Sequence, residues 1–144
     1  MSYLIDTCVL SEAMKRSPDS RVIEWIDGAP SDALFVSALT LGEIRKGVEG
    51  MGPGRRRERI GAWLEIELPA WFDDRVLPID AAVADRWGRL TSRRIRTLPA
   101  IDALLAATAL HHRLAIVTRN IADFTGTGVS LINPWDGSGD KGTP

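Results

Sequence analysis

The chain is 144 residues long, the size of one ordinary domain, and its hydrophobic content of 44% excludes a disordered protein. Its single cysteine, Cys8, excludes an internal disulfide and cannot by itself form a structural zinc site, which favours a reducing cytoplasm. A formal net charge of −1 gives no overall indication of nucleic-acid binding. No signal peptide is expected, because Asp6 interrupts the apolar start, and no apolar stretch is long enough to span a membrane.

The first half of the chain alternates between strand patterns and helical patterns. In chain order, the sequence predicts a strand at residues 3–5, a helix at 21–27 capped by Asp19 or Ser20, a strand at 34–37 and a helix from Thr40 to about Gly50. Residues 51–54 (MGPG) form a break. A long helix is predicted to follow, from Arg55 to about Leu68, where Pro69 ends it.

The second half continues the alternation. The predicted elements are a strand at residues 76–77, a helix from Ala81 to about Arg94 capped by Asp80, a helix from Pro99 to about His111, and strands at 115–118 and 130–132. Short apolar strands are typical of a parallel sheet covered on both faces, so the predicted fold is an α/β/α sandwich with a mainly parallel central sheet. Residues 1–136 are predicted to form one domain, and residues 137–144 a disordered tail.

Four carboxylates lie where the predicted elements bring chain segments to one edge of the sheet. Asp6 directly follows the first strand, and Glu43 lies in the first turn of the helix after the second strand. Asp123 follows a late strand, and Asp102 lies in the first turn of an otherwise apolar helix. Ligands of open α/β sheets bind at the carboxyl ends of the strands. We therefore expect three of these acids to gather there, and the fourth to join them if its helix starts there.

Clustered carboxylates are expected to need a cation. Like charges repel one another, and desolvating them without a counter-charge is costly. Oxygen ligands favour Mg²⁺ or Mn²⁺ over zinc, and such ions activate water and stabilise the charge that develops in phosphoryl transfer. The sequence therefore predicts a metal site that mediates contact with phosphate.

Three of the acids also have a purely structural interpretation. Glu43 and Thr40 fit a capping box, in which Glu43 would only cap its own helix. Asp102 is favoured in a first turn by the helix dipole alone. Asp6 could cap the turn that follows it.

Four segments follow one another in a recognisable order. They are LIDTCVLSE at residues 4–12, SALTLGEIRKG at 37–47, IDALLAATA at 101–109 and VTRNIADF at 117–124. Together they resemble the motifs of PIN-domain toxins of the VapC type, and NPW at 133–135 is similar to the FitB-like branch of these proteins. Four motifs in order at suitable spacing are more specific than any one of them.

The resemblance implies a Mg²⁺-dependent endoribonuclease that forms a homodimer and is inhibited by a cognate VapB-like antitoxin. It implies that Asp6 and Asp102 are metal ligands. It also implies that Glu43 and Asp123 complete the acidic cluster, directly or through water, and that Thr118 orients a metal-bound water.

Two positions depart from the pattern of the family. Many relatives carry Asn where this chain has Cys8, which puts a polar role of that position in doubt. Many carry Asp where this chain has Asn120, which shifts the fourth acidic role to Asp123. Asn120 remains a candidate for contact with metal-bound water or substrate, and so does Arg119, the basic residue beside the site.

Basic residues also gather in two runs elsewhere. These are Arg55, Arg56, Arg57 and Arg59, and Arg93, Arg94 and Arg96. Solvated helix ends are the simpler interpretation of each run, and phosphate contact with RNA is the alternative.

Two other functions are compatible with part of the pattern. A receiver-like phosphoacceptor domain is also α/β and holds Mg²⁺ with acids at strand ends, but it needs a Lys after a late strand, where this chain has Arg119 and Asn120. A non-catalytic PIN-like binding module would carry a degenerate site, against which the intact set of four acids argues.

Overall fold

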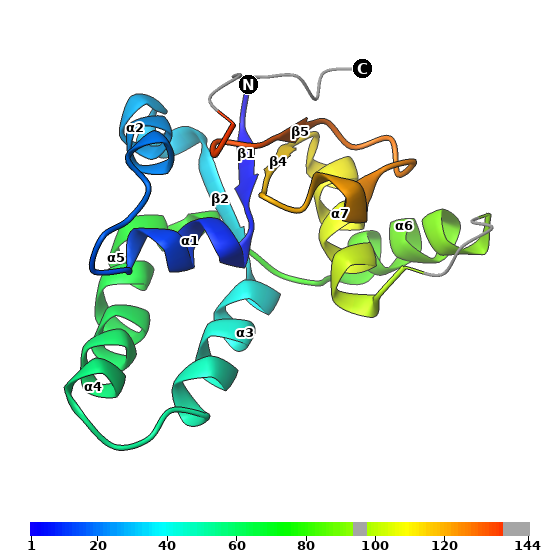
Figure 1. Cartoon of the computed structure of the whole chain (residues 1–144). Helices are drawn as coiled ribbons and strands as arrows, with labels where there is room; N and C mark the ends of the chain where they lie inside the picture. Colours follow the sequence, from blue (N-terminus) through cyan, green and yellow to red (C-terminus); the bar gives the residue numbers. More distant parts are fainter. Residues whose placement is uncertain (94–97, 137–144) are drawn as a thin grey trace.

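The central element of the fold is a parallel β-sheet. The computed structural model describes residues 1–93 and 98–136, and within them the sheet has five strands in the order β3-β2-β1-β4-β5. They are β1 (Tyr3–Ile5), β2 (Leu34–Ser37), β3 (Val76–Leu77), β4 (Ala115–Val117) and β5 (Leu131–Ile132). Neighbouring strands are parallel, so their carboxyl ends meet at one edge of the sheet (Figure 1).

The first strand of the chain lies in the middle of this sheet. Tyr3 of β1 lies opposite Leu34 of β2 on one side and opposite Ala115 of β4 on the other. The pairing extends to Ser2, whose carbonyl accepts a hydrogen bond from the Ala115 N–H at 3.0 Å. β1 is thus held between an early strand and a late one.

Helices cover both faces of the sheet. They are α1 (Thr7–Ala13), α2 (Ser20–Gly28), α3 (Ala38–Glu49), α4 (Arg55–Ala62), α5 (Leu68–Phe72), α6 (Ala81–Ser92) and α7 (Ala100–His112). Leu4 and Ile116 pack in a hydrophobic cluster with side chains of α7, whereas Ile5 and Val117 pack in a second cluster with side chains of α1 to α5 (Figure 1). Strand side chains therefore alternate between two buried faces, which confirms the predicted α/β/α sandwich.

Helix α1 was not predicted. It begins directly after β1, because Asp6 is its N-cap and the Asp6 Oδ1 atom accepts a hydrogen bond from the Thr7 N–H at 2.8 Å. The helix buries Val9 and Leu10 in the core. The structural interpretation of Asp6 as a cap is therefore correct, and any further role of this carboxylate is additional.

The end of α1 is tied to the start of α2 by Glu12. This side chain is 5% exposed, and its Oε2 atom accepts a hydrogen bond from the Asp19 N–H at 2.8 Å. Its Oε1 atom forms an ion pair with Lys15 at 2.8 Å. The hydrogen bonds from Lys15 and Asp19 hold the pKa of Glu12 below its ordinary value of 4.5. The segment between the two helices is thereby fixed on the α1 side of the sheet.

The prediction that Pro69 ends the long helix is wrong. The chain continues from α4 through a π-helical turn (Trp63–Glu67) into α5, which contains Pro69. In the π turn the Leu68 N–H bonds to the Trp63 carbonyl, five residues earlier. This change of register places Pro69 in the first turn of α5, where a missing N–H costs no helical bond.

The other predicted elements are present, with small shifts at their ends. Asp19 and Asp80 cap α2 and α6 through hydrogen bonds from the N–H groups of Arg21 and Val83. The predicted extension of α6 to Arg94 and the predicted tail at 137–144 lie outside the described residues. Within the described ranges, no helix is long and apolar enough to cross a membrane.

Candidate metal centre at the carboxyl edge of the sheet

Asp6 lies where β1 and β4 end side by side. Its N–H donates to the Val117 carbonyl at 3.0 Å, which continues the strand pairing by one residue. While Oδ1 caps α1, Oδ2 accepts a hydrogen bond from the Thr118 hydroxyl at 2.8 Å. Two hydrogen bonds from different elements therefore fix the plane of this carboxylate.

Thr118 links this carboxylate to the loop that follows β4. Its side chain is fully buried, and its Oγ1 atom also accepts a hydrogen bond from the Asn120 N–H at 3.0 Å. Thr118 therefore contacts the site through Asp6, and its role in orienting a metal-bound water stays a prediction. The Thr118 hydroxyl therefore fixes both the orientation of the Asp6 carboxylate and the path of the loop after β4.

Cys8 occupies the position where many relatives have Asn. Its Sγ atom lies 3.7 Å from Asp6 Oδ2 and 3.7 Å from Thr118 Oγ1, and it accepts a hydrogen bond from the Arg119 N–H at 3.5 Å. Burial, followed by the charge of Asp6, raises the pKa of the thiol above its ordinary value of 9.0, which keeps it neutral. The neutral thiol thus contacts the Asp6 carboxylate, the Thr118 hydroxyl and the Arg119 N–H.

Glu43 reaches the site from α3. Its Oε1 atom accepts a hydrogen bond from the Thr7 hydroxyl at 2.6 Å, so Glu43 bonds to α1. The predicted capping box is wrong, because α3 begins at Ala38 and its cap is Ser37, whose Oγ accepts from the Leu39 N–H at 3.1 Å. Glu43 therefore lies beyond the first turn of α3, where the backbone N–H groups already bond within the helix.

Asp102 lies in the first turn of α7, as predicted, and its pKa is affected by the charges of the other three acids. Its pKa is raised from the ordinary value of 3.8, first by burial and then by the negative charges of Asp123, Asp6 and Glu43. Asp6, Glu43 and Asp123 are thus each within electrostatic range of Asp102. We refer to Asp6, Glu43, Asp102 and Asp123 as the acidic cluster.

Asp123 lies on a 3₁₀ turn (Ile121–Phe124) beyond β4 and is exposed. The turn is closed by a hydrogen bond from the Asp123 N–H to the Asn120 carbonyl at 3.1 Å. Asp123 contributes to the raised pKa of Asp102, whereas Asn120 carries no charge. Of Asn120 and Asp123, it is therefore Asp123 that adds negative charge to the cluster.

The donor set fits a hard divalent cation in chemical type. It consists of carboxylate oxygens with a buried hydroxyl beside them, the ligands that Mg²⁺ and Mn²⁺ prefer. Within residues 1–93 and 98–136, no Lys or Arg lies within ion-pair distance of the four acids. In the same part of the chain, no three acidic, His or Cys side chains converge closely enough to enclose an ion. A cation would therefore have to draw the carboxylates inward from their mutually repelled positions.

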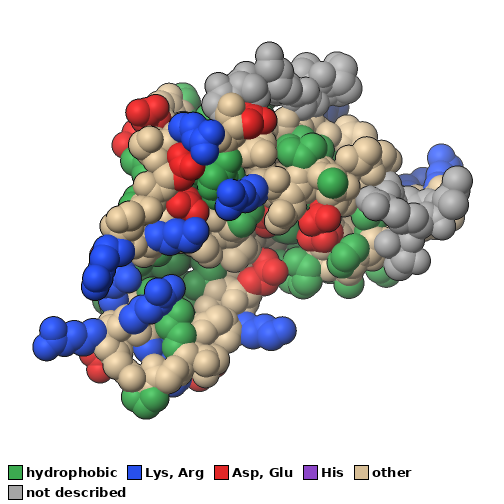
Figure 2. All heavy atoms as spheres, in the orientation of Figure 1, with side chains coloured by type: hydrophobic (Ala, Val, Ile, Leu, Met, Phe, Trp, Pro, Cys, Tyr) green, Lys and Arg blue, Asp and Glu red, His purple; other side chains and the backbone are tan. Residues whose placement is uncertain are grey.

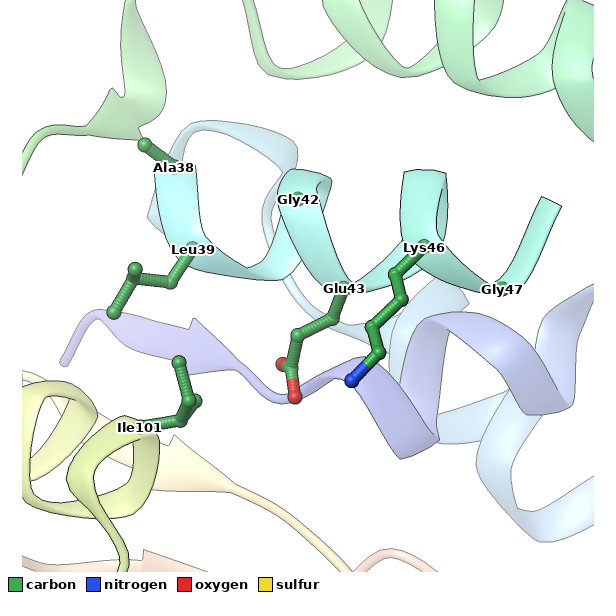
Figure 3. A pocket seen from close by; sticks show the side chains of 7 residues that line it. All are labelled: Ala38, Leu39, Gly42, Glu43, Lys46, Gly47 and Ile101. Atoms are coloured by element: carbon green, nitrogen blue, oxygen red, sulfur yellow. The ribbon is translucent and has the colours of Figure 1, made fainter. Parts of the chain in front are cut away.

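A groove of about 680 Å³ opens beside the acidic cluster, between α3 and the start of α7. Figure 3 shows Glu43 and Lys46 extending from α3 on the same side, with Leu39 and Ile101 facing each other across the groove. Small residues on α3, Gly42 among them, leave this space open. The groove gives a large ligand room next to Glu43.

Charged side chains are distributed unevenly over the surface around the site. Figure 2 shows Lys and Arg side chains gathered on the side of the molecule that carries α1, α2 and α4, with acidic side chains between this region and α7. Exposed members of the basic region are Lys15, Arg16, Arg21, Arg55, Arg56 and Arg59. Arg56 of this region and Glu43 line one cavity, so the basic region adjoins the acidic cluster at Glu43.

The fold and the site together define an α/β protein whose acids meet at the carboxyl edge of a parallel sheet. The sequence matches the family model described as the PIN domain over residues 3–125, and the chain belongs to this family. The resemblance inferred from the four motifs is thereby confirmed.

Similar proteins cover nearly the whole chain. The VapC ribonuclease Y4jK of Sinorhizobium fredii is 34% identical over 136 residues, which are 92% of this chain and 97% of that protein. Toxin FitB of Neisseria gonorrhoeae is 33% identical over 135 residues, with 92% and 97% covered. The crystal structure of FitAcB from Neisseria gonorrhoeae matches with a TM-score of 0.86 and 32% identity, covering 92% of this chain and 98% of that one.

Proposed function

We propose that the chain is a metal-dependent endoribonuclease, the toxin of a type II toxin–antitoxin pair of the VapBC kind. The observation that carries the proposal is that Asp6, Glu43 and Asp123 lie within electrostatic range of Asp102, whose pKa is raised first by burial and then by their charges. A cluster of this kind costs stability unless it binds a cation. The names of the relatives, VapC ribonuclease and Toxin FitB, support this activity.

Asp6 and Asp102 would hold the metal, Mg²⁺ in the first instance with Mn²⁺ as the alternative, and Glu43 and Asp123 would complete its surroundings. When bound, such an ion supplies an activated water and charge stabilisation for phosphodiester cleavage. Thr118 holds the Asp6 carboxylate in place, and the Thr7 hydroxyl does the same for Glu43. The groove beside Glu43 admits the RNA strand.

A cognate VapB-like antitoxin is the proposed partner, a homodimer the proposed assembly and the cytoplasm the proposed location. Support for the partner comes from matched structures titled FitAcB and FitAB bound to IR36 DNA fragment. The receiver-like alternative finds no support, since Thr118, Arg119 and Asn120 follow β4 where a Lys would be needed.

The direct test incubates the purified protein with total cellular RNA in Mg²⁺, in Mn²⁺ and in EDTA, and maps the cut ends by sequencing. We expect cleavage at defined sites with either metal and none in EDTA. Protection by a co-expressed product of the neighbouring reading frame would identify the antitoxin. If over-production is harmless to the host and no RNA is cut with either metal, the proposal is wrong.

Thr118→Val is expected to reduce cleavage by about ten- to a hundredfold. The substitution keeps the buried shape but removes the hydroxyl that donates to Asp6 and accepts from the Asn120 N–H. The Asp6 carboxylate thereby loses a hydrogen bond to a charged acceptor, which is worth about 1.5–3 kcal/mol. Thr118→Ser is the matched control and should retain activity. Equal activity of the Val and wild-type proteins would exclude a positioning role for this hydroxyl.

A further inference from the structure

Trp135, the last residue of the NPW segment, lies against Arg119 at the edge of the acidic cluster. The guanidinium carbon of Arg119 is 5.1 Å from the centroid of the indole ring, within the range of a cation–π interaction. Trp135 is only 6% exposed and packs in the same core cluster as Val117 of β4. Arg119, in contrast, is exposed. A buried ring therefore supports an exposed cation.

The position of the ring is fixed by its own segment. The Asn133 Oδ1 atom accepts a hydrogen bond from the Trp135 N–H at 2.9 Å, which forms a turn around Pro134. The segment follows β5 directly, and the last residue of β5, Ile132, accepts a hydrogen bond from the Thr118 N–H at 2.9 Å. The NPW segment is thus tied to the loop that carries Arg119.

The main chain of Arg119 is fixed as well. Its N–H donates to Cys8 Sγ at 3.5 Å, and the residue before it, Thr118, donates to Asp6 Oδ2 at 2.8 Å. The backbone of Arg119 is therefore held beside Cys8 and Asp6, and its guanidinium lies against the Trp135 ring. Such double fixation favours a binding role, because little side-chain entropy remains to be lost.

Asp19, an acid near this arginine among the described residues, does not neutralise it. The pKa of Asp19 is lowered to about 2, first by the hydrogen bonds from Arg21 and only to a smaller extent by the charge of Arg119. Asp19 is paired with Arg21 at 2.8 Å. The charge of Arg119 is therefore free to act on a ligand at the carboxyl edge of the sheet.

We propose that Trp135 is a positioning residue that holds the guanidinium of Arg119 where it binds a phosphate of the RNA beside the acidic cluster. The inference rests on the proposed function, and it identifies one contact between the nuclease and its RNA substrate. A guanidinium that lies against a ring keeps N–H donors at its edge, and these match two oxygens of one phosphate. A fixed positive charge here lets a polyanion approach four carboxylates.

The test measures binding and cleavage of a short fluorescent single-stranded RNA oligonucleotide. The variants are Arg119→Gln and Trp135→Phe, singly and combined. The matched control is Arg89→Gln on α6, an exposed arginine paired with Asp85. Anisotropy in EDTA at several salt concentrations gives Kd without cleavage, and initial rates in Mg²⁺ give kcat and KM.

Arg119→Gln is expected to raise Kd and KM about tenfold or more and to lower the salt dependence of log Kd by about 0.7, the value for one lost phosphate contact with a single strand. Trp135→Phe is expected to raise Kd about two- to threefold, because Phe is a weaker cation–π partner. In the Arg119→Gln background it should change Kd no further, since the ring acts through the guanidinium. Arg89→Gln should bind like the wild type.

The outcomes separate this inference from the proposed function. If Trp135→Phe raises Kd equally in both backgrounds, the ring has only a structural role and the inference is wrong. If the wild type cuts RNA and Arg119→Gln binds and cuts equally well, the inference fails while the nuclease function stands. If the wild type binds through Arg119 but never cuts, the nuclease function fails alone. A wild type that neither binds nor cuts contradicts both.

Discussion

Asp102→Asn is expected to lower metal-dependent RNA cleavage by on the order of a thousandfold or more. The amide keeps the size of the side chain and removes the negative oxygen through which the acid would bind a divalent cation. Loss of the ion removes several kcal/mol of transition-state stabilisation, and each 1.36 kcal/mol is tenfold in rate. Initial rates on an RNA substrate in Mg²⁺ measure the effect, and Asp6→Asn should behave alike.

Asp85→Asn provides the matched control for this experiment. Asp85 is exposed on α6, where it pairs only with Arg89 at 2.8 Å, and the same chemical change there should leave cleavage unchanged. A folded Asp102→Asn protein that cuts RNA at the wild-type rate would exclude Asp102 from the site. If all three variants lose activity together, general damage to the protein is the cause.

The same substitution is expected to raise the melting temperature in EDTA at neutral pH by roughly 2–4 °C, the shift for about 1 kcal/mol in a chain of this size. The folded-state pKa of Asp102 is raised by burial and by Asp123, Asp6 and Glu43. The folded chain therefore binds more protons than the unfolded chain, and stability falls as the pH rises from the ordinary pKa of 3.8 through the raised value. Asn removes this penalty, so the gain should disappear as the pH falls below 3.8.

The response to metal provides the second arm of the melting experiment. Mg²⁺ should stabilise the wild type, by about 2.7 kcal/mol at a hundredfold excess over Kd, and do little for Asp102→Asn. Asp6→Asn should gain less in EDTA than Asp102→Asn, because Asp6 also caps α1 and accepts from Thr118. If Asp102→Asn melts several degrees below the wild type in EDTA, and Mg²⁺ leaves the wild type unchanged, Asp102 is structural.

Local patterns explain why most of the fold could be predicted. The strands are short β-branched or apolar runs, and the caps Asp19 and Asp80 act on N–H groups within three residues. Helix α1 was missed because its seven residues make only about two turns, too few for a helical periodicity to stand out. The π turn before Pro69 was missed because it depends on how Trp63 and Leu64 pack against the rest of the core.

The acids of the site could be predicted because their positions follow from strand ends. Asp6 directly follows β1 and Asp123 follows β4, and parallel topology brings these strand ends to one edge. Asp102 joins them because α7 begins there, a condition that the sequence left open. The hydroxyl of Thr7 and the thiol of Cys8 could not, because their contacts with Glu43 and Thr118 join segments far apart in the sequence. Trp135 was noted only as part of a motif, and its contact with Arg119 depends on how β5 lies beside β4.

The place of β1 between β2 and β4 has a consequence for the order of synthesis. Asp6 leaves the ribosome well before its partner Thr118, which lies 112 positions later in the chain. Until that segment emerges, one edge of β1 is unpaired and the Asp6 carboxylate lacks the hydroxyl that orients it. Domains whose contacts are so distant in sequence cannot complete their fold on a partial chain. A nuclease built in this way is expected to stay inert toward the RNAs of its own translation until the segment of β4 and Thr118 has been made.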